Sequence, residues 1–227
     1  MLQLGDFGIG RRSAPTFIDT IERLANTLDL RVLITPGSYD DWSALRLAFR
    51  ARPQSPLQLT EHIYALPRGC RFTIAGRRFL SFGGGASARF VDAEAGSQTV
   101  VPTAVEVDRS VAAGAVDVLL LHEAVDDAVR QVATKIRYEA RRQRQSASVL
   151  EASRASRALV TDLRNRLRPA VTLHAHMHTR GAHRDAASTV ISLSRESRSG
   201  NVGFLYLPTL QFTWLEQATS QAASHAH

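Results

Sequence analysis

The chain has 227 residues, of which 44% are hydrophobic and 22% are charged, and this composition excludes an intrinsically disordered protein. Its single cysteine, Cys70, excludes an internal disulfide framework and any zinc site built from several thiolates. The 28 lysine and arginine residues against 21 acidic residues give a net charge of +7, but the arginines are spread along the chain, so nucleic acid is not an expected partner.

The sequence shows neither a membrane-spanning run nor a recognisable signal peptide. Its apolar runs fall short of the roughly 18 residues that a transmembrane helix requires. The first residues, MLQLGDFGIGRR, include an acid at Asp6 and lack the basic start of a signal peptide. We therefore expect a soluble, cytoplasmic protein without a membrane partner.

Short apolar runs alternate with amphipathic stretches in the first half of the chain, a pattern typical of an α/β protein. Proline and glycine residues mark the points where these elements end. The predicted strands are residues 2–4, 31–35, 62–66, 71–74 and 78–82, and the predicted helices are residues 13–28 and 41–50.

The second half continues the alternation after an irregular insertion at residues 86–103, which shows no clear periodicity. We expect one domain over residues 1–217 and a flexible tail of small and polar residues at 218–227. The predicted helices lie near residues 104–113, 126–142 and 149–166, and the predicted strands are 116–121, 170–173, 189–193, 202–207 and 211–214.

Arginines are densest between Arg137 and Arg168, where two of these helices are predicted. We expect the arginines to line solvated helix faces and not a nucleic-acid groove. The apolar faces of the same helices would consist of Ile136, Val149, Leu150, Leu159, Val160 and Leu163.

Polar side chains follow several of the predicted strands directly. Asp6, the segment Gly37-Ser38-Tyr39-Asp40, His122 and the pair His176 and His178 all occupy such positions. Because ligand sites in open α/β sheets lie beyond the carboxyl ends of the strands, these side chains are expected to converge. Carboxylate and imidazole groups are ligands for zinc, manganese and iron ions.

The segment His174-Ala175-His176-Met177-His178 holds three of the eight histidines in the chain. In an extended backbone all three side chains would point to one side. Their clustering after a buried strand favours metal binding, whereas the alternative is an exposed polar loop.

Taken in order, these motifs resemble those of the calcineurin-like metallophosphoesterase family. The segments that carry the resemblance are QLGDFGI, HIYALPRG, RFLSFGGGAS and VDVLLLHEA. The family pattern is D-x-H, then G-D, then G-N-H-D/E, then a lone histidine, then G-H-x-H. Here Gly5-Asp6 matches the second block, His122 matches the lone histidine, and His176 and His178 match the last block.

The resemblance implies a four-layer αββα sandwich, with two mixed sheets flanked by helices and without the family's first strand. It implies that Asp6 bridges two metal ions. One ion would also take Ser38, His122 and His176, and the other would take His178. Tyr39 would stand at the position of the family's catalytic histidine. His174 and Asp40 would lie beside the ligands without binding metal.

The departures from the pattern reduce the expected activity. The D-x-H block is absent, and Ser38 and Tyr39 replace the asparagine and histidine of the third block. Asp6, His122 and His176 remain as a two-histidine, one-carboxylate set for one divalent ion (manganese, iron or zinc), whereas a second ion would have too few ligands. Either an upstream segment carries the missing block or the gene has drifted.

The sequence thus predicts a metal-dependent phosphoesterase-like hydrolase with impaired activity towards a phosphomonoester or phosphodiester. The alternative is an inactive metal-binding or interaction module with the same fold. An arginine-rich nucleic-acid binder is a weaker third interpretation.

Overall fold

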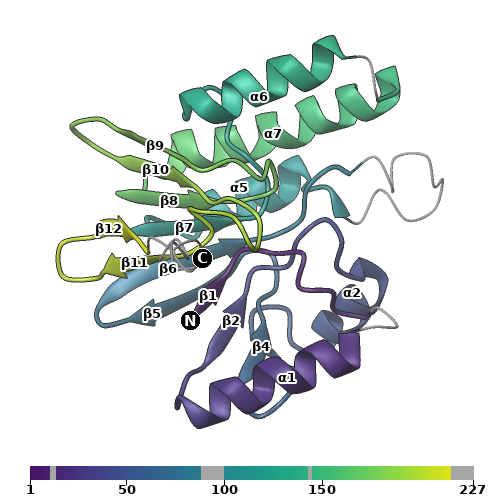
Figure 1. Cartoon of the computed structure of the whole chain (residues 1–227), viewed down its shortest axis with the longest axis vertical. Helices are drawn as coiled ribbons and strands as arrows, with labels where there is room; N and C mark the ends of the chain where they lie inside the picture. The colour runs from purple at the N-terminus through teal and green to yellow at the C-terminus, as the bar shows by residue number, and fades with distance from the viewer. Residues whose placement is uncertain (11–13, 88–99, 143–144, 216–227) are drawn as a thin grey trace, which may run out of the picture.

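Two mixed sheets and a separate hairpin form the β structure of the computed structural model, which describes residues 1–10, 14–87, 100–142 and 145–215 (Figure 1). The four-stranded sheet has the order β1 (Leu2–Gln3), β2 (Val32–Ile34), β4 (Ile63–Ala65) and β3 (Leu57–Gln58). The six-stranded sheet has the order β5 (Cys70–Ile74), β6 (Arg77–Phe82), β7 (Val118–Leu121), β8 (Val171–His174), β10 (Thr189–Ser192) and β9 (Gly181–Arg184). The hairpin consists of β11 (Gly203–Tyr206) and β12 (Gln211–Trp214).

The central strands of the six-stranded sheet are buried on both faces, because their side chains alternate between two cores. In β7, Val118 and Leu120 point to one core, and Leu119 and Leu121 point to the other. The first core also receives Leu4, which follows β1 of the four-stranded sheet. The two sheets therefore pack against each other through this core, as expected for consecutive apolar residues in a parallel strand.

Helices cover the outer faces of both sheets (Figure 1). Helices α1 (Ala14–Thr27) and α2 (Trp42–Ala51) pack on the four-stranded sheet, where Ile34 and Leu45 are fully buried. Helices α5 (Ala104–Ala112) and α7 (Ala147–Leu167) pack on the six-stranded sheet, and α6 (Arg130–Arg141) lies alongside α7. The predicted α/β sandwich of two mixed sheets with flanking helices is confirmed.

A buried hydrogen bond joins the two sheets in addition to the apolar core. The hydroxyl of Thr35, directly after β2, lies 2.9 Å from the hydroxyl of Ser81 in β6. Both side chains are fully buried. Because a buried hydroxyl without a partner is costly, this pair also favours one relative position of the two sheets.

Two strands were not predicted, and one helix begins later than predicted. Strand β9 has no apolar residue larger than alanine, and its antiparallel pairing with β10 places it in the sheet. Strand β3 has only two residues. Helix α6 begins at Arg130 and not at residue 126, because Asp127 has a φ of 54°, which is incompatible with a right-handed helix. The predicted tail at 218–227 and most of the predicted insertion lie outside the described residues.

The prediction for the arginine-rich stretch was wrong for Arg157. That side chain is only 8% exposed, and its Nε donates to Asp126 Oδ1 at 2.6 Å. A buried arginine requires such a partner because its charge cannot be removed. Arg164 is half-buried, and the other described arginines of the stretch are exposed. Val149, Val160 and Leu163 are buried as predicted.

None of the helices in the described parts of the chain is long and apolar enough to cross a membrane.

Cys70 provides a test of the packing around β5. Its side chain is fully buried, and burial raises the pKa of the thiol to about 11. Since only the thiolate reacts, alkylation by iodoacetamide at pH 8 should be about a hundredfold slower in the native protein than in the urea-unfolded chain. Equal rates in the two states would contradict the packing.

Candidate metal centre

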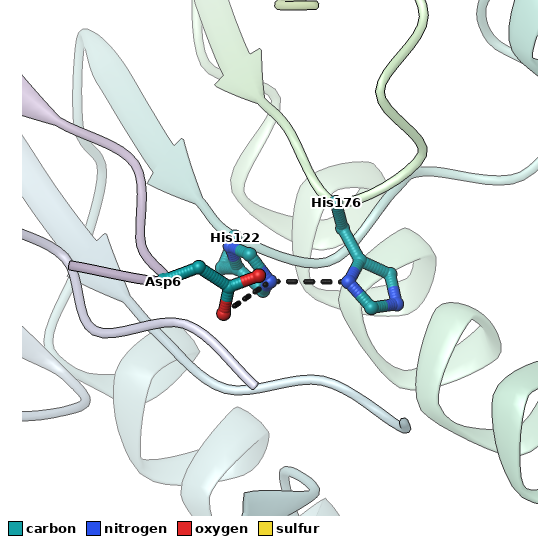
Figure 2. Close-up of side chains that lie close together, drawn as sticks. All are labelled: Asp6, His122 and His176. Carbon is teal, nitrogen blue, oxygen red and sulfur yellow. Dashed lines mark hydrogen bonds and ion pairs between the residues drawn. The ribbon is translucent and has the colours of Figure 1, made fainter. Parts of the chain in front are cut away.

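Three side chains from three strand ends meet at one point between the two sheets (Figure 2). Asp6 follows β1 of the four-stranded sheet, whereas His122 directly follows β7 of the six-stranded sheet. His176 lies in the loop after β8. One ligand atom from each of these residues lies within 4.8 Å of the other two. The expected convergence at the carboxyl ends of the strands is present for these three residues.

His122 is held in one tautomer by the protein backbone. The ring is only 2% exposed, and its Nδ1 lies 2.7 Å from the carbonyl oxygen of Leu4. Because a carbonyl oxygen only accepts, Nδ1 carries the proton, and Nε2 presents a lone pair. Burial lowers the pKa of His122, although the nearby Asp6 carboxylate opposes this shift. The ring is therefore a neutral ligand with Nε2 available.

His176 is oriented in the same way but presents its other nitrogen. Its Nε2 lies 3.0 Å from the carbonyl oxygen of Ala86, so Nε2 carries the proton and Nδ1 presents a lone pair. A backbone φ of 60° at His176 turns the loop sharply after β8 and brings the ring towards His122.

The atoms of Asp6, His122 and His176 that face one another are all hydrogen-bond acceptors. His122 Nε2 lies 3.1 Å from His176 Nδ1 and 3.4 Å from Asp6 Oδ1 (Figure 2). Lone pairs this close repel unless a cation lies among them. Around a metal ion with bonds of about 2.0–2.2 Å, neighbouring ligand atoms lie about 2.9–3.5 Å apart. The donor set and its spacing therefore fit one divalent ion of the zinc, manganese or iron type.

Asp6 is positioned by the turn that follows β2. Its Oδ1 accepts a hydrogen bond from the backbone N–H of Tyr39 at 2.7 Å, and the Ser38 hydroxyl lies 3.4 Å from the same oxygen. Ser38 is fully buried, whereas the side chain of Tyr39 is 38% exposed. The structure thus brings Ser38 and Tyr39 to the cluster, with Tyr39 contributing its backbone to Asp6.

Asp40 connects the two loops that build the site. Its carboxylate accepts hydrogen bonds from the backbone N–H groups of Gly8 and Gly37 at 2.7 Å and of Ile9 at 2.9 Å. Burial raises the pKa of Asp40, and these hydrogen bonds oppose the shift. Asp40 therefore holds the loop after β1 and the loop after β2 together through their backbone N–H groups.

Two glycines allow the loops to approach closely. A Cβ atom on Gly5 would lie 2.3 Å from His122 Nδ1, and Gly5 also has a φ of 95°. A Cβ atom on Gly37 would lie 2.2 Å from the backbone nitrogen of Asp6. Any other residue at either position would displace the ligands.

His178 and His174 lie outside the group of converging ligand atoms. His178 is exposed, with a φ of 51°, and burial of part of its ring lowers its pKa. His174 is fully buried in β8, and burial lowers its pKa to about 4, so the ring is neutral at physiological pH. Among the described residues neither ring nitrogen of His174 has a hydrogen-bond partner.

Glu123 is a functional candidate that the sequence reasoning missed. Its side chain is fully buried, and Oε2 accepts a hydrogen bond from the Ala86 N–H at 3.1 Å. The carbonyl of Ala86 in turn holds His176, and Glu123 Oε1 lies 3.8 Å from His176 Nε2. The signal was an acid directly after His122, at the end of the apolar run Val118–Leu121 in VDVLLLHEA.

A second group of metal-capable side chains, Glu22, Glu61 and His62, differs from the first in its partners. Glu22 Oε1 lies 2.7 Å from His62 Nδ1, and its Oε2 accepts a hydrogen bond from Thr60. These contacts hold the Glu22 pKa below its usual range. In this group the imidazole faces the carboxylate as a hydrogen-bond partner, so the pair does not require a cation, whereas His122 and His176 face each other with acceptor nitrogens.

No protein-family model matches the chain, and a search of curated proteins gives no match.

Which nitrogen of each histidine ring binds the metal ion can be tested directly. On titration with zinc we expect His122 to coordinate through Nε2 and His176 through Nδ1, because backbone carbonyls hold the other nitrogens. Nitrogen-15 NMR of the histidine rings distinguishes these forms, with exposed His183 as an internal control. Coordination of His122 through Nδ1 would contradict the arrangement.

Substitution of Gly37 tests the close approach of the loops. A Cβ atom at this position would displace Asp6, so Gly37→Ala should weaken zinc binding more than tenfold. The matched control is Gly76→Ala, where a φ of 77° makes alanine cost roughly 1 kcal/mol but no atom lies within 4 Å. Equal zinc affinity in both variants would show that the Gly37 contact does not position Asp6.

Proposed function

We propose that the protein is a hydrolase of phosphate esters that uses one divalent ion held by Asp6, His122 and His176. The observation that carries this proposal is that His122 Nε2 lies 3.1 Å from His176 Nδ1 and 3.4 Å from Asp6 Oδ1, with the three ligand atoms all within 4.8 Å of one another. Two histidines and one carboxylate leave further coordination positions for water and substrate. A divalent ion held there would draw electron density from a phosphate oxygen and make a water molecule more acidic.

The order of the motifs along the chain supports the same reaction class. Gly5-Asp6, His122 and the His176–His178 segment occur in the order found in calcineurin-like metallophosphoesterases. The substrate class that this resemblance suggests is a phosphomonoester or phosphodiester. Hydrolysis would add water across the P–O ester bond and release an alcohol and a phosphate.

Each residue of the site has a separate task in this proposal. His122 binds the ion through Nε2 and His176 binds it through Nδ1, and the Asp6 carboxylate is the third ligand. Tyr39 lies in the turn beside Asp6, and its phenol would donate a hydrogen bond to an oxygen of the substrate. A phenol stabilises developing charge less than a cationic histidine does, so we expect slow turnover.

Two observations favour a binding module as the second candidate. Ser38 is fully buried, and its hydroxyl lies against Asp6, which leaves it poorly placed to add a ligand. His178, the candidate ligand for a second ion, is exposed and outside the cluster. A centre with one ion could bind a phosphate group and still fail to hydrolyse the ester.

Metal content and activity together test the proposal. The chain loaded with manganese or zinc should hold one ion and hydrolyse aryl phosphate monoesters or diesters slowly. His176→Ala should lower metal affinity more than about a hundredfold and abolish turnover, whereas His183→Ala, on exposed strand β9, should change neither.

The remaining outcomes separate the two candidates. One bound ion with no turnover on any ester would favour the binding module. Two tightly bound ions with fast turnover, or activity that survives His176→Ala, would contradict the proposed centre.

A further inference from the structure

A cavity of about 570 Å³ lies between α2, α5 and the turn before β5. Helix α2 contributes Arg46, Phe49 and Arg50 to its wall, and α5 contributes Arg109. The volume is within the range of about 300–1,000 Å³ that is usual for small-molecule sites.

The charge of this cavity is strongly unbalanced. Among the residues that the structure describes, five arginines line it and Glu106 is the single acid. The Glu106 carboxylate already has partners. Its Oε2 lies 2.9 Å from Arg68 Nη1, and it forms a capping box with Thr103 at the start of α5. Arg71 is also engaged, since its Nη2 donates to the carbonyl oxygens of Ser110 and Gly114 at 2.7 Å.

The three remaining arginines, Arg46, Arg50 and Arg109, are exposed around the opening. Within the described parts of the chain no carboxylate forms an ion pair with any of them. Burial lowers the pKa of Arg68, the Glu106 carboxylate opposes this shift, and the positive charge of nearby Arg46 adds to it. Folding thus gathers positive charges whose mutual repulsion an anion would relieve.

We propose that this cavity binds a small molecule that carries two linked phosphate groups. Arginine guanidinium groups match phosphate oxygens with paired hydrogen bonds, and three unneutralised arginines suit a ligand with more than one negative charge. Phe49, Pro53 and Pro67 form an apolar part of the wall, which leaves room for the organic part of such a ligand.

The cavity is distinct from the candidate metal centre. Neither Asp6 nor either metal-binding histidine lines it. Trp42 lies between the two sites, because it lines the cavity and its Nε1 donates to the carbonyl oxygen of Gly37 at 2.7 Å. Phosphate binding in the cavity therefore needs no metal, and this inference does not depend on the proposed function.

Calorimetric titration with pyrophosphate in excess EDTA and low salt tests the proposal. We expect one site in the native chain, with weaker binding of citrate because its carboxylates do not match the arginines as linked phosphates do. Arg46→Gln, Arg50→Gln and Arg109→Gln combined should weaken pyrophosphate binding more than tenfold. The matched control combines Arg137→Gln, Arg141→Gln and Arg184→Gln, three exposed arginines outside the cavity, and should change the affinity less than twofold.

Further variants keep the test valid if the triple substitution disturbs folding. Arg109→Gln alone should weaken binding several-fold, and pyrophosphate should raise the melting temperature of the native chain more than that of this variant. His176→Ala should bind pyrophosphate as the native chain does in EDTA. Absence of binding to the native chain, equal losses in the control, equal affinity for citrate, or loss of binding in His176→Ala would each overturn the proposal.

Discussion

The hydrogen bond from His122 Nδ1 to the carbonyl oxygen of Leu4 connects the two sheets and sets the chemistry between them. At 2.7 Å it joins the end of β7 to the segment that follows β1. It also fixes the proton on Nδ1 and thereby turns the lone pair of Nε2 towards Asp6 and His176. The rest of the site is arranged around this one tautomer.

The loops near this bond are built so that it can form. Gly5 has no Cβ atom that would meet the His122 ring, and Asp40 binds the backbone of the loops after β1 and β2 together. On the other side, Glu123 holds Ala86, and the carbonyl of Ala86 holds His176. His122 and His176 thus each have a backbone carbonyl behind the ring, which leaves one nitrogen per ring for an ion.

The sequence was sufficient to predict the elements in which the pattern of apolar residues matches the pattern of buried residues. The apolar run of β7 is fully buried, and Leu45 and Phe49 of α2 are buried as their periodicity indicates. The predicted apolar face of α1 was only partly right, because Ile18 and Ile21 are half-buried whereas Leu24 and Leu28 are exposed. Strand β9 could not be predicted in this way, because Gly181–Arg184 has no apolar pattern and is a strand only through pairing with β10. The start of α6 depends on a left-handed residue, Asp127, which no periodicity reveals.

The sequence predicted the residues of the candidate site that the carboxyl ends of the strands bring together. Asp6, His122 and His176 follow strands whose carboxyl ends meet, so their convergence followed from topology. The position of His178 did not, because it depends on left-handed turns at both His176 and His178. Glu123 was missed because its role arises from a contact with Ala86, which lies far away in the sequence. The arginine-lined cavity also depends on how α2 and α5 pack against each other.

Anomalous X-ray diffraction from crystals grown with zinc would test the central claim most directly, because it locates the ion without reference to activity. The account predicts an anomalous peak about 2.0–2.2 Å from His122 Nε2, His176 Nδ1 and a carboxylate oxygen of Asp6. A well-ordered site without such a peak at saturating zinc, or a peak bound by Glu22 and His62 alone, would contradict it.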